Sequence, residues 1–251
     1  MDLTSSPPEL TIFVPTRGRP DNLADFAGEF YRYASCRTKV VFVFDEDDRD
    51  LARYISKNDN RWEYYVAGVT RRGMVGALNE AFRHYAKSGK LGFAVGFMGD
   101  DHRPRTPDWD KSYIDVLRGL QTGFVYGNDL FQFDRIPTQI SFTTDIALAV
   151  GYMCPPEMDH LCVDVVWKDW GTAIDKIQYL EDVVIEHMHP LAGKNKNDKQ
   201  YRAVNSNFMA RHDNDAYLIY HDPKGREISR FQEDVGKIKM MMEFGYIEGS
   251  S

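Results

Sequence analysis

The chain is poor in cysteine and has no excess of positive charge. Its 251 residues include three cysteines, Cys36, Cys154 and Cys162, and none of them form a C-x-x-C pair. An odd number without that spacing predicts free thiols in a reducing compartment rather than a disulfide framework. The net charge is −7, from 31 basic and 38 acidic residues. Proteins that coat nucleic acid are normally basic because they neutralise phosphates, so this composition argues against such a role.

Long hydrophobic runs and a secretory signal pattern are also missing. The longest apolar run, IALAVGYMC, is far shorter than the about 20 residues that a membrane-spanning helix needs. The first residues, MDLTSSPPEL, contain neither a basic segment nor an apolar one. We therefore expect a cytoplasmic protein without a membrane partner.

Two common nucleotide-binding signatures are absent as well. No G-x-G-x-x-G follows the first strand-like segment, and no G-x-x-x-x-G-K-[ST] occurs anywhere in the chain. These absences argue against a nicotinamide-dependent dehydrogenase and against a P-loop kinase.

Apolar strand-like segments and amphipathic helical segments alternate through the first hundred residues. Strands are expected at 10–15, 39–44, 62–68 and 91–98, with helices at 21–33, 48–55 and 74–86. This pattern predicts an α/β fold with a mostly parallel, Rossmann-type sheet and helices on both faces. The polar segments TRGRP, DEDD, TRRG and GDDH all follow strands. Because ligands bind beyond the carboxyl ends of parallel strands, these loops are expected to meet in one crevice.

The second half of the chain is less regular. Further strands are expected at 123–129, 138–142 and 177–190, and helices at 106–120, 143–151, 157–171 and from residue 201 onward.

Two adjacent carboxylates stand at the end of the fourth predicted strand. In GFMGDDHRP, Asp100 and Asp101 follow Gly99 and precede His102. Their like charges repel unless a cation lies between them, and carboxylate and imidazole groups are suitable ligands for Mg²⁺ or Mn²⁺. The alternative is a solvated turn, in which aspartate is common.

The order VPTRGRP, FDEDD, RRGMVGALNEA, FMGDDHRP resembles that of GT-A fold glycosyltransferases, including the small soluble enzymes of bacteria and phages. The resemblance covers residues 10–104. It implies a nucleoside-diphosphate sugar as donor, with UDP favoured, and a D-x-D-type motif that carries Mn²⁺ or Mg²⁺. The sequence here is D-D-H, so the third position departs from the D-x-D pattern.

The resemblance also implies roles for individual residues. Asp101 would bind the metal, and Asp100 would lie near the ribose or the sugar of the donor. The other implied nucleotide-binding residues are Pro15, Thr16 and Arg17 along the pocket, Asp45 at the base, and Arg72, Gly73 and Asn79 closing over the nucleotide and its ribose. A late histidine would complete the metal site. His187 and His189 are two apart on a predicted strand and so share a face, and both stay candidates.

Sugar transfer with inversion needs a carboxylate that takes the proton of the acceptor hydroxyl. The predicted helix 157–171 offers Glu157, Asp159, Asp164 and Asp169. On such a helix Asp164 shares a face with His160 among apolar neighbours, and burial there would raise the pKa of Asp164. We choose Asp164 as the base.

The sequence thus predicts a metal-dependent glycosyltransferase acting on a soluble acceptor hydroxyl: a protein, a small molecule or a modified DNA base. Two alternatives remain, a nucleotidyltransferase that acts on sugar phosphates and an inert nucleotide-sugar binding module. The expected organisation is an N-terminal arm at 1–9, a donor half at 10–104, an acceptor and catalytic half at 105–200 with a mobile loop at 191–200, and a helical segment of the same domain at 201–251.

Overall fold

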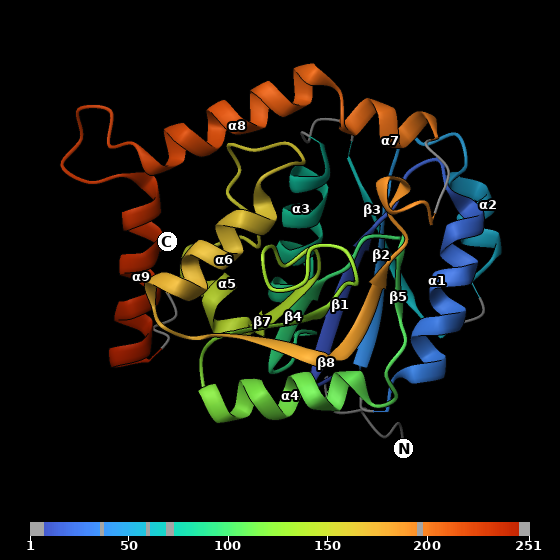
Figure 1. The fold of residues 1–251 in the computed structure, drawn as a ribbon, viewed down its shortest axis with the longest axis horizontal. Helices are drawn as coiled ribbons and strands as arrows, with labels where there is room; N and C mark the ends of the chain where they lie inside the picture. The colour runs from blue at the N-terminus through green and yellow to red at the C-terminus, as the bar shows by residue number, and fades with distance from the viewer. Residues whose placement is uncertain (1–7, 36–37, 59–60, 69–72, 195–197, 246–251) are drawn as a thin grey trace.

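The structure is a computed structural model that describes residues 8–35, 38–58, 61–68, 73–194 and 198–245. Within these residues one sheet of eight strands has helices on both faces (Figure 1). The strands are β1 (Leu10–Pro15), β2 (Thr38–Asp45), β3 (Glu63–Ala67), β4 (Ala94–Phe97), β5 (His102–Pro104), β6 (Phe124–Asn128), β7 (Ile140–Thr143) and β8 (Ile177–His187). The helices are α1 (Pro20–Tyr33), α2 (Leu51–Ser56), α3 (Gly73–Lys87), α4 (Trp109–Leu120), α5 (Thr144–Val150), α6 (Val163–Ala173), α7 (Lys199–Val204), α8 (Asn207–His221) and α9 (Arg230–Phe244), with a short 3-10 helix, η1, at Pro190–Ala192.

The sheet has the strand order β3-β2-β1-β4-β7-β6-β8-β5. Strands β3, β2, β1 and β4 pair in parallel, as the alternating pattern predicts. Beyond β4 the sheet becomes mixed, because β7 runs antiparallel to both β4 and β6, while β8 runs parallel to β6 and antiparallel to β5. The expected α/β fold, with a mostly parallel sheet covered on both faces, is confirmed.

Each face of the sheet has its own hydrophobic core, because alternate side chains of a strand point to opposite sides. On β1, Phe13 belongs to one core, whereas Ile12 and Val14 belong to the other. The core around Phe13 is covered by α3, α5, α6, α8 and α9. The opposite core is covered by α1, α2 and α4. Neither face is left for solvent, which explains why the central strands are apolar along their whole length.

The helix expected at 157–171 is wrong in its first part. Helix α6 starts at Val163, and the segment before it has no regular helix. Cys162, at the helix N-cap, has a left-handed backbone with φ of 65°. Asp213 on α8 accepts hydrogen bonds from the backbone N–H groups of residues 159–161. These groups therefore point to α8 and do not take part in a helical turn. His160 and Asp164 therefore do not share a helix face.

The strand expected at 177–190 ends at His187. His189 lies outside the strand, where it caps η1, so the two histidines do not share a strand face as expected. In the loop expected to be mobile, residues 195–197 lie outside the described residues and Asp198 caps α7. Of the expected arm, Pro8 and Glu9 are described. The division into arm, halves and mobile loop stays a prediction.

Helices α7 and α8 run across the edge of the sheet at which the parallel strands end (Figure 1). The polar segments after β1, β2 and β4 come together at this edge. Within the described part of the chain, no helix combines the length and the hydrophobicity that crossing a membrane would require.

Candidate active site

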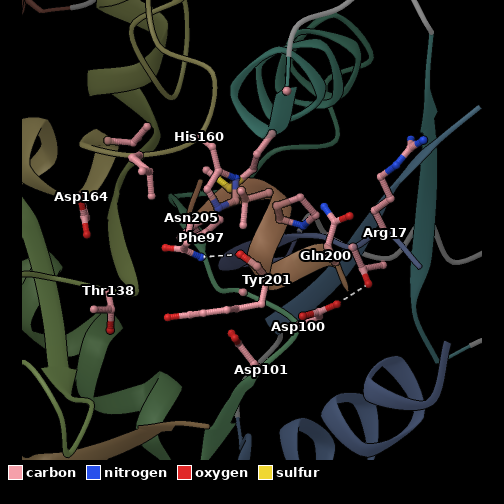
Figure 2. A pocket seen from close by; sticks show the side chains of 18 of the residues that line it. Arg17, Phe97, Asp100, Asp101, Thr138, His160, Asp164, Gln200, Tyr201 and Asn205 are labelled. Carbon is pink, nitrogen blue, oxygen red and sulfur yellow. Dashed lines mark hydrogen bonds between the residues drawn. The ribbon is translucent and has the colours of Figure 1, made fainter. Parts of the chain in front are cut away.

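A cavity of about 630 Å³ lies where the parallel strands end. Its walls come from the segments after β1, β2 and β4, the start of α3, residues 131–138, residues 160–164 and helix α7. Figure 2 shows Arg17 at one end of the cavity and Asp164 with Thr138 at the other, with Asp101 between them. Tyr201, from α7, points into the middle. The cavity is therefore elongated, and segments that are far apart in the sequence contribute to it.

Most of the predicted site residues lie on this cavity. The predicted residues that line it are Pro15, Thr16, Arg17, Asp45, Gly73, Asp100, Asp101, Asp164, His187 and His189. Arg72 lies outside the described residues. Asn79 does not line the cavity: it is buried in α3, where its side chain bonds to the backbone of Met153 and Cys154. Nucleotide binding by Arg72 and Asn79 stays a prediction.

The loop after β1 is tied to the first carboxylate of the D-D-H turn. The hydroxyl of Thr16 donates to Asp100 Oδ2 over 2.5 Å, and Arg19 Nη1 donates to Asp100 Oδ1 over 3.2 Å. Arg19 also binds both oxygens of Asp198, at 2.8 and 3.0 Å. Because Asp198 caps α7, this arginine joins the first loop of the chain to the helix that covers the cavity.

The end of the cavity around Arg17 carries charges of both signs. Arg17 Nη1 donates to Asp45 Oδ2 over 2.6 Å and to Asp47 Oδ1 over 2.5 Å. Asp45 is buried, whereas half of the Asp47 side chain is exposed. A carboxylate beside a guanidinium can accept hydrogen bonds from a base or a ribose while the arginine balances its charge.

The backbone beneath the D-D-H turn is held firmly. The buried Arg103 donates from Nη1 to the carbonyl oxygens of Asp100 and His102, at 2.8 and 2.7 Å. A side chain at Gly99 would come within 2.8 Å of Asp101 Oδ1 and 3.1 Å of His102 Nδ1. A larger residue at this position would therefore displace the side chains of Asp101 and His102.

Asp101, His102 and His187 form a group whose ligand atoms lie within 4.8 Å of one another. Asp101 Oδ1 lies 3.6 Å from His187 Nε2 and 3.5 Å from His102 Nδ1. His102 and His187 are paired across β5 and β8, and their rings stack at 4.3 Å. However, His102 Nδ1 already accepts the N–H of Gly99 over 3.0 Å. Asp101 and His187 are thus the members of the group that can bind a cation without losing this bond.

His189 lies beside this group but has other partners. Its Nδ1 accepts the N–H of Leu191 over 3.2 Å, and its Nε2 lies 3.4 Å from the hydroxyl of Tyr201. Its ring stacks on Phe131 at 4.7 Å. These contacts connect His189 to α7 and to the wall of the cavity, and they favour His187 as the metal-binding histidine.

The two adjacent carboxylates differ in their environment. Burial and the charge of Asp101 raise the pKa of Asp100 to about 6. Burial would also raise the pKa of Asp101, but the imidazoles of His187 and His102 outweigh it and lower that pKa. Burial and the neighbouring His187 lower the pKa of His102 to about 3, which keeps this imidazole neutral. Asp101 is therefore the stronger acid of the two and stays ionised to lower pH.

Asp164 lies in the first turn of α6 at the other end of the cavity (Figure 2). Burial raises its pKa, although the backbone N–H of Val165, which donates to Oδ1 over 2.9 Å, opposes this shift. Its neighbours on the cavity wall include Val163, Trp167 and Thr138. A partly desolvated carboxylate with a raised pKa is suited to accept a proton near neutral pH.

The segment before Asp164 is fixed by a carboxylate from another helix. Asp213 of α8 is fully buried and accepts the N–H groups of Asp159, His160 and Leu161, at 2.9, 2.9 and 2.5 Å. His212 Nδ1 also lies 2.8 Å from Asp213. This anchor determines where His160 and Leu161 line the cavity.

Several residues of the cavity are not among the site residues predicted from the sequence, although His160 is considered there as a neighbour of Asp164. Those on the wall are Arg19, Phe131, Thr138, His160 and Tyr201. Asp129 lies just behind it. Asp129 could have been found, because it is the last residue of a predicted strand and so lies at a strand end, as Asp45 and Asp100 do. Tyr201 carries no local signal, since its place depends on the contact between Arg19 and Asp198.

Neither a protein-family model nor a curated protein matches the sequence. Solved structures do resemble the fold. The mannosyltransferase PcManGT from Pyrobaculum calidifontis, in complex with GDP-Man and Mn²⁺, has a TM-score of 0.61 and 15% identity, over 97% of this chain and 77% of that one. S. aureus TarS 1–349 in complex with UDP-GlcNAc has a TM-score of 0.55 and 13% identity, over 94% of this chain and 81% of that one.

A longer S. aureus TarS structure has a TM-score of 0.57 and 14% identity, over 89% of this chain and 44% of that one. At these identities the likeness concerns the fold. The chain has the GT-A-like α/β fold that its motif order predicts.

Proposed function

We propose that this protein is a metal-dependent glycosyltransferase that moves a sugar from a nucleoside-diphosphate sugar to an acceptor hydroxyl. One observation carries the proposal: the Asp101, His102 and His187 group lies on the same cavity as a separate half-buried carboxylate, Asp164. The GT-A-like fold supports it, since the neighbours in that fold bind GDP-Man or UDP-GlcNAc.

The donor set fits a divalent cation. One carboxylate and two imidazoles, those of Asp101, His102 and His187, form a ligand set that suits Mn²⁺. Asp101 and His187 would hold the ion, with Mn²⁺ or Mg²⁺ as candidates. When bound, the cation supplies positive charge that stabilises the leaving diphosphate.

The chain's own residues perform the other tasks. Asp45, beside Arg17, is placed to accept hydrogen bonds from the base or ribose of the nucleotide. Arg19 holds Asp100 and covers the diphosphate region together with α7. Asp164 takes the proton of the acceptor hydroxyl as that oxygen attacks the anomeric carbon, and the reaction inverts the configuration. His160 and Leu161 form part of the acceptor wall.

In this proposal the donor is a nucleoside-diphosphate sugar, with UDP favoured, and the acceptor reaches Asp164 from the end opposite Arg17. A protein, a small molecule and a modified DNA base all remain in this class.

The decisive experiment measures thermal stability with UDP, GDP, CDP, TDP and ADP and their sugars, with and without Mn²⁺. Ligand binding raises the unfolding free energy by RT ln(1 + [L]/Kd). We expect one nucleoside diphosphate to raise the unfolding temperature. This rise should require Mn²⁺ and should disappear in Asp101→Ala. The absence of a shift with every nucleotide contradicts the proposal.

Product analysis separates the alternatives. Release of a nucleoside diphosphate identifies sugar transfer, whereas release of pyrophosphate identifies a nucleotidyltransferase. Tight binding without turnover across a screen of hydroxyl acceptors identifies an inert binding module.

A further inference from the structure

Asp129 is a buried carboxylate at the end of β6, directly behind the candidate metal group. It is 1% exposed, and its Oδ1 accepts the backbone N–H groups of Phe131, Gln132 and Phe133, at 2.9, 2.6 and 3.0 Å. Its Oδ2 accepts the hydroxyl of Thr138 over 2.8 Å. Oδ1 thus anchors the loop after β6, whereas Oδ2 is not needed for this anchor.

The second oxygen faces His187. Asp129 Oδ2 lies 3.9 Å from His187 Nδ1, and the backbone N–H of His187 donates to the carbonyl of Asp129 over 3.0 Å. The opposite ring nitrogen, Nε2, lies 3.6 Å from Asp101 Oδ1. Within the described chain Nδ1 has no hydrogen-bond partner, although it is buried. The imidazole therefore lies between two carboxylates, one on the cavity and one behind it.

We propose that Asp129 is a positioning residue that fixes the orientation and tautomer of His187 for metal binding. This inference rests on the metal-dependent function proposed above. A neutral imidazole carries one ring proton, and a metal-binding histidine usually donates it to a carboxylate or carbonyl. With its proton on Nδ1, facing Asp129, His187 presents the lone pair of Nε2 to the side of Asp101.

The same carboxylate also connects to the second histidine of the group. His102 Nε2 lies 3.3 Å from Thr138 Oγ1, and Thr138 donates to Asp129. If His102 Nδ1 accepts from Gly99, its proton is on Nε2 and points to Thr138. Asp129 would then orient both imidazole rings from the side away from the cavity: His187 directly, and His102 through Thr138.

Asp129→Asn separates this role from the anchoring of the loop. The amide oxygen of Asn still accepts the N–H groups of residues 131–133, so the loop keeps its anchor. The amide nitrogen then replaces Oδ2 and presents a donor to His187 Nδ1. This favours the tautomer with the proton on Nε2, which cannot bind a metal. We expect the affinity for Mn²⁺ to fall by about 10- to 100-fold.

Asp213→Asn is the matched control. Asp213 is also buried, also accepts three consecutive backbone N–H groups and also contacts a histidine, but that histidine, His212, is not in the metal group. The affinity of Mn²⁺ would be measured by electron paramagnetic resonance in the presence of UDP, for the wild type and both variants. A loss in Asp129→Asn with wild-type affinity in Asp213→Asn supports the inference.

Two other results have different meanings. If the wild type binds Mn²⁺ and Asp129→Asn binds it equally well, or both variants weaken it equally, Asp129 has only a structural role. If the wild type itself does not bind Mn²⁺ with UDP or another nucleoside diphosphate, the proposed function fails, and this inference with it.

A measurement on the wild type covers the case in which Asp129→Asn does not fold. Nitrogen-15 shifts of the His187 ring, recorded with the diamagnetic ion Mg²⁺ and UDP, report which nitrogen carries the proton. A proton on Nδ1 is expected, and a proton on Nε2 overturns the inference.

Discussion

The two ends of the cavity are built in different ways. The end around Arg17 consists of side chains that follow directly from the parallel strands β1, β2 and β4. The end around Asp164 is assembled from α6, the segment before it and the loop after β6, and it relies on contacts such as Asp213 with residues 159–161. The first end is thus encoded locally, and the second depends on long-range anchors. Substitutions at the first should impair nucleotide binding, and substitutions at the second should impair turnover.

The largest effect is expected between the two ends, at Asp101. Replacement by Ala removes the carboxylate that would hold the cation beside His187, so the negative charges of the diphosphate and Asp100 would lack the cation that balances them. We expect Mn²⁺-dependent nucleotide binding to fall by about 100-fold or more and turnover to be lost. Calorimetric titration with UDP and Mn²⁺ measures the first effect. If Asp101→Ala binds UDP and Mn²⁺ as tightly as the wild type does, the D-D-H turn does not bind the metal.

Asp164→Asn tests the second end alone. The amide has the shape of the carboxylate but cannot accept a proton, so turnover should fall by about 10² to 10⁴-fold while nucleotide binding is unchanged. Asp169→Asn is the control on the same helix, because Asp169 bonds to Tyr217 and does not line the cavity. Equal losses in both variants would contradict a role for Asp164 as the base.

The pH dependence of turnover sharpens the same assignment. Burial raises the pKa of Asp164, and a base must be ionised to act. Turnover should therefore rise with pH. The midpoint of this rise should lie above the ordinary pKa of aspartate, about 3.9. A midpoint at or below that value in the wild-type pH profile would show that a different group accepts the proton.

A smaller effect is expected from Asp213→Asn. The amide nitrogen would face backbone N–H groups of residues 159–161, so this segment of the acceptor wall should shift. We expect this shift to lower kcat/KM for the acceptor by about 10- to 100-fold, because the acceptor is no longer held in the reactive position. UDP binding should be unchanged. Steady-state kinetics with the acceptor varied measure the split. A loss of UDP affinity of the same size would mean that the two ends are not independent.

The smallest effect on binding is expected from Asn79→Ala. Asn79 bonds to the backbone around Met153 and Cys154 and does not line the cavity. Its loss leaves buried backbone groups without partners, which costs about 1–3 kcal/mol of unfolding free energy. Denaturant unfolding measures this cost. If the variant binds UDP more weakly, Asn79 contributes to the nucleotide site as its motif suggests.

Prediction from the sequence succeeded where structure is local. The apolar runs of β1, β2 and β4 and the amphipathic pattern of α3 determine the parallel half of the sheet, because each segment carries its own periodicity. The helix before Val163 was wrong because Asp213, about 50 residues further along, takes the backbone N–H groups of that segment. The hydrophobic periodicity of a segment cannot reveal a contact with a residue so far along the chain.

The same limit applies to the site. Thr16, Arg17, Asp45, Asp100 and Asp101 could be placed on one crevice because strand ends of a parallel sheet meet at one edge. Asp164 lines the cavity as predicted, although the helix-face argument for it was wrong. The proposal of His187 over His189 as the metal-binding residue rests on the positions of Leu191 and Tyr201, which contact His189 and could not be predicted from the sequence.

The Arg19–Asp198 ion pair has a consequence for the order in which the molecule forms. The two residues are 179 positions apart, so their contact closes a very long loop. Contacts between such distant residues form slowly because the entropy of loop closure must be overcome first. We expect the sheet and both hydrophobic cores to form before this ion pair fixes α7 over the cavity, so that the crevice stays open until late in folding. Pulse-labelling hydrogen exchange should find the amides of residues 199–204 among the last to gain protection.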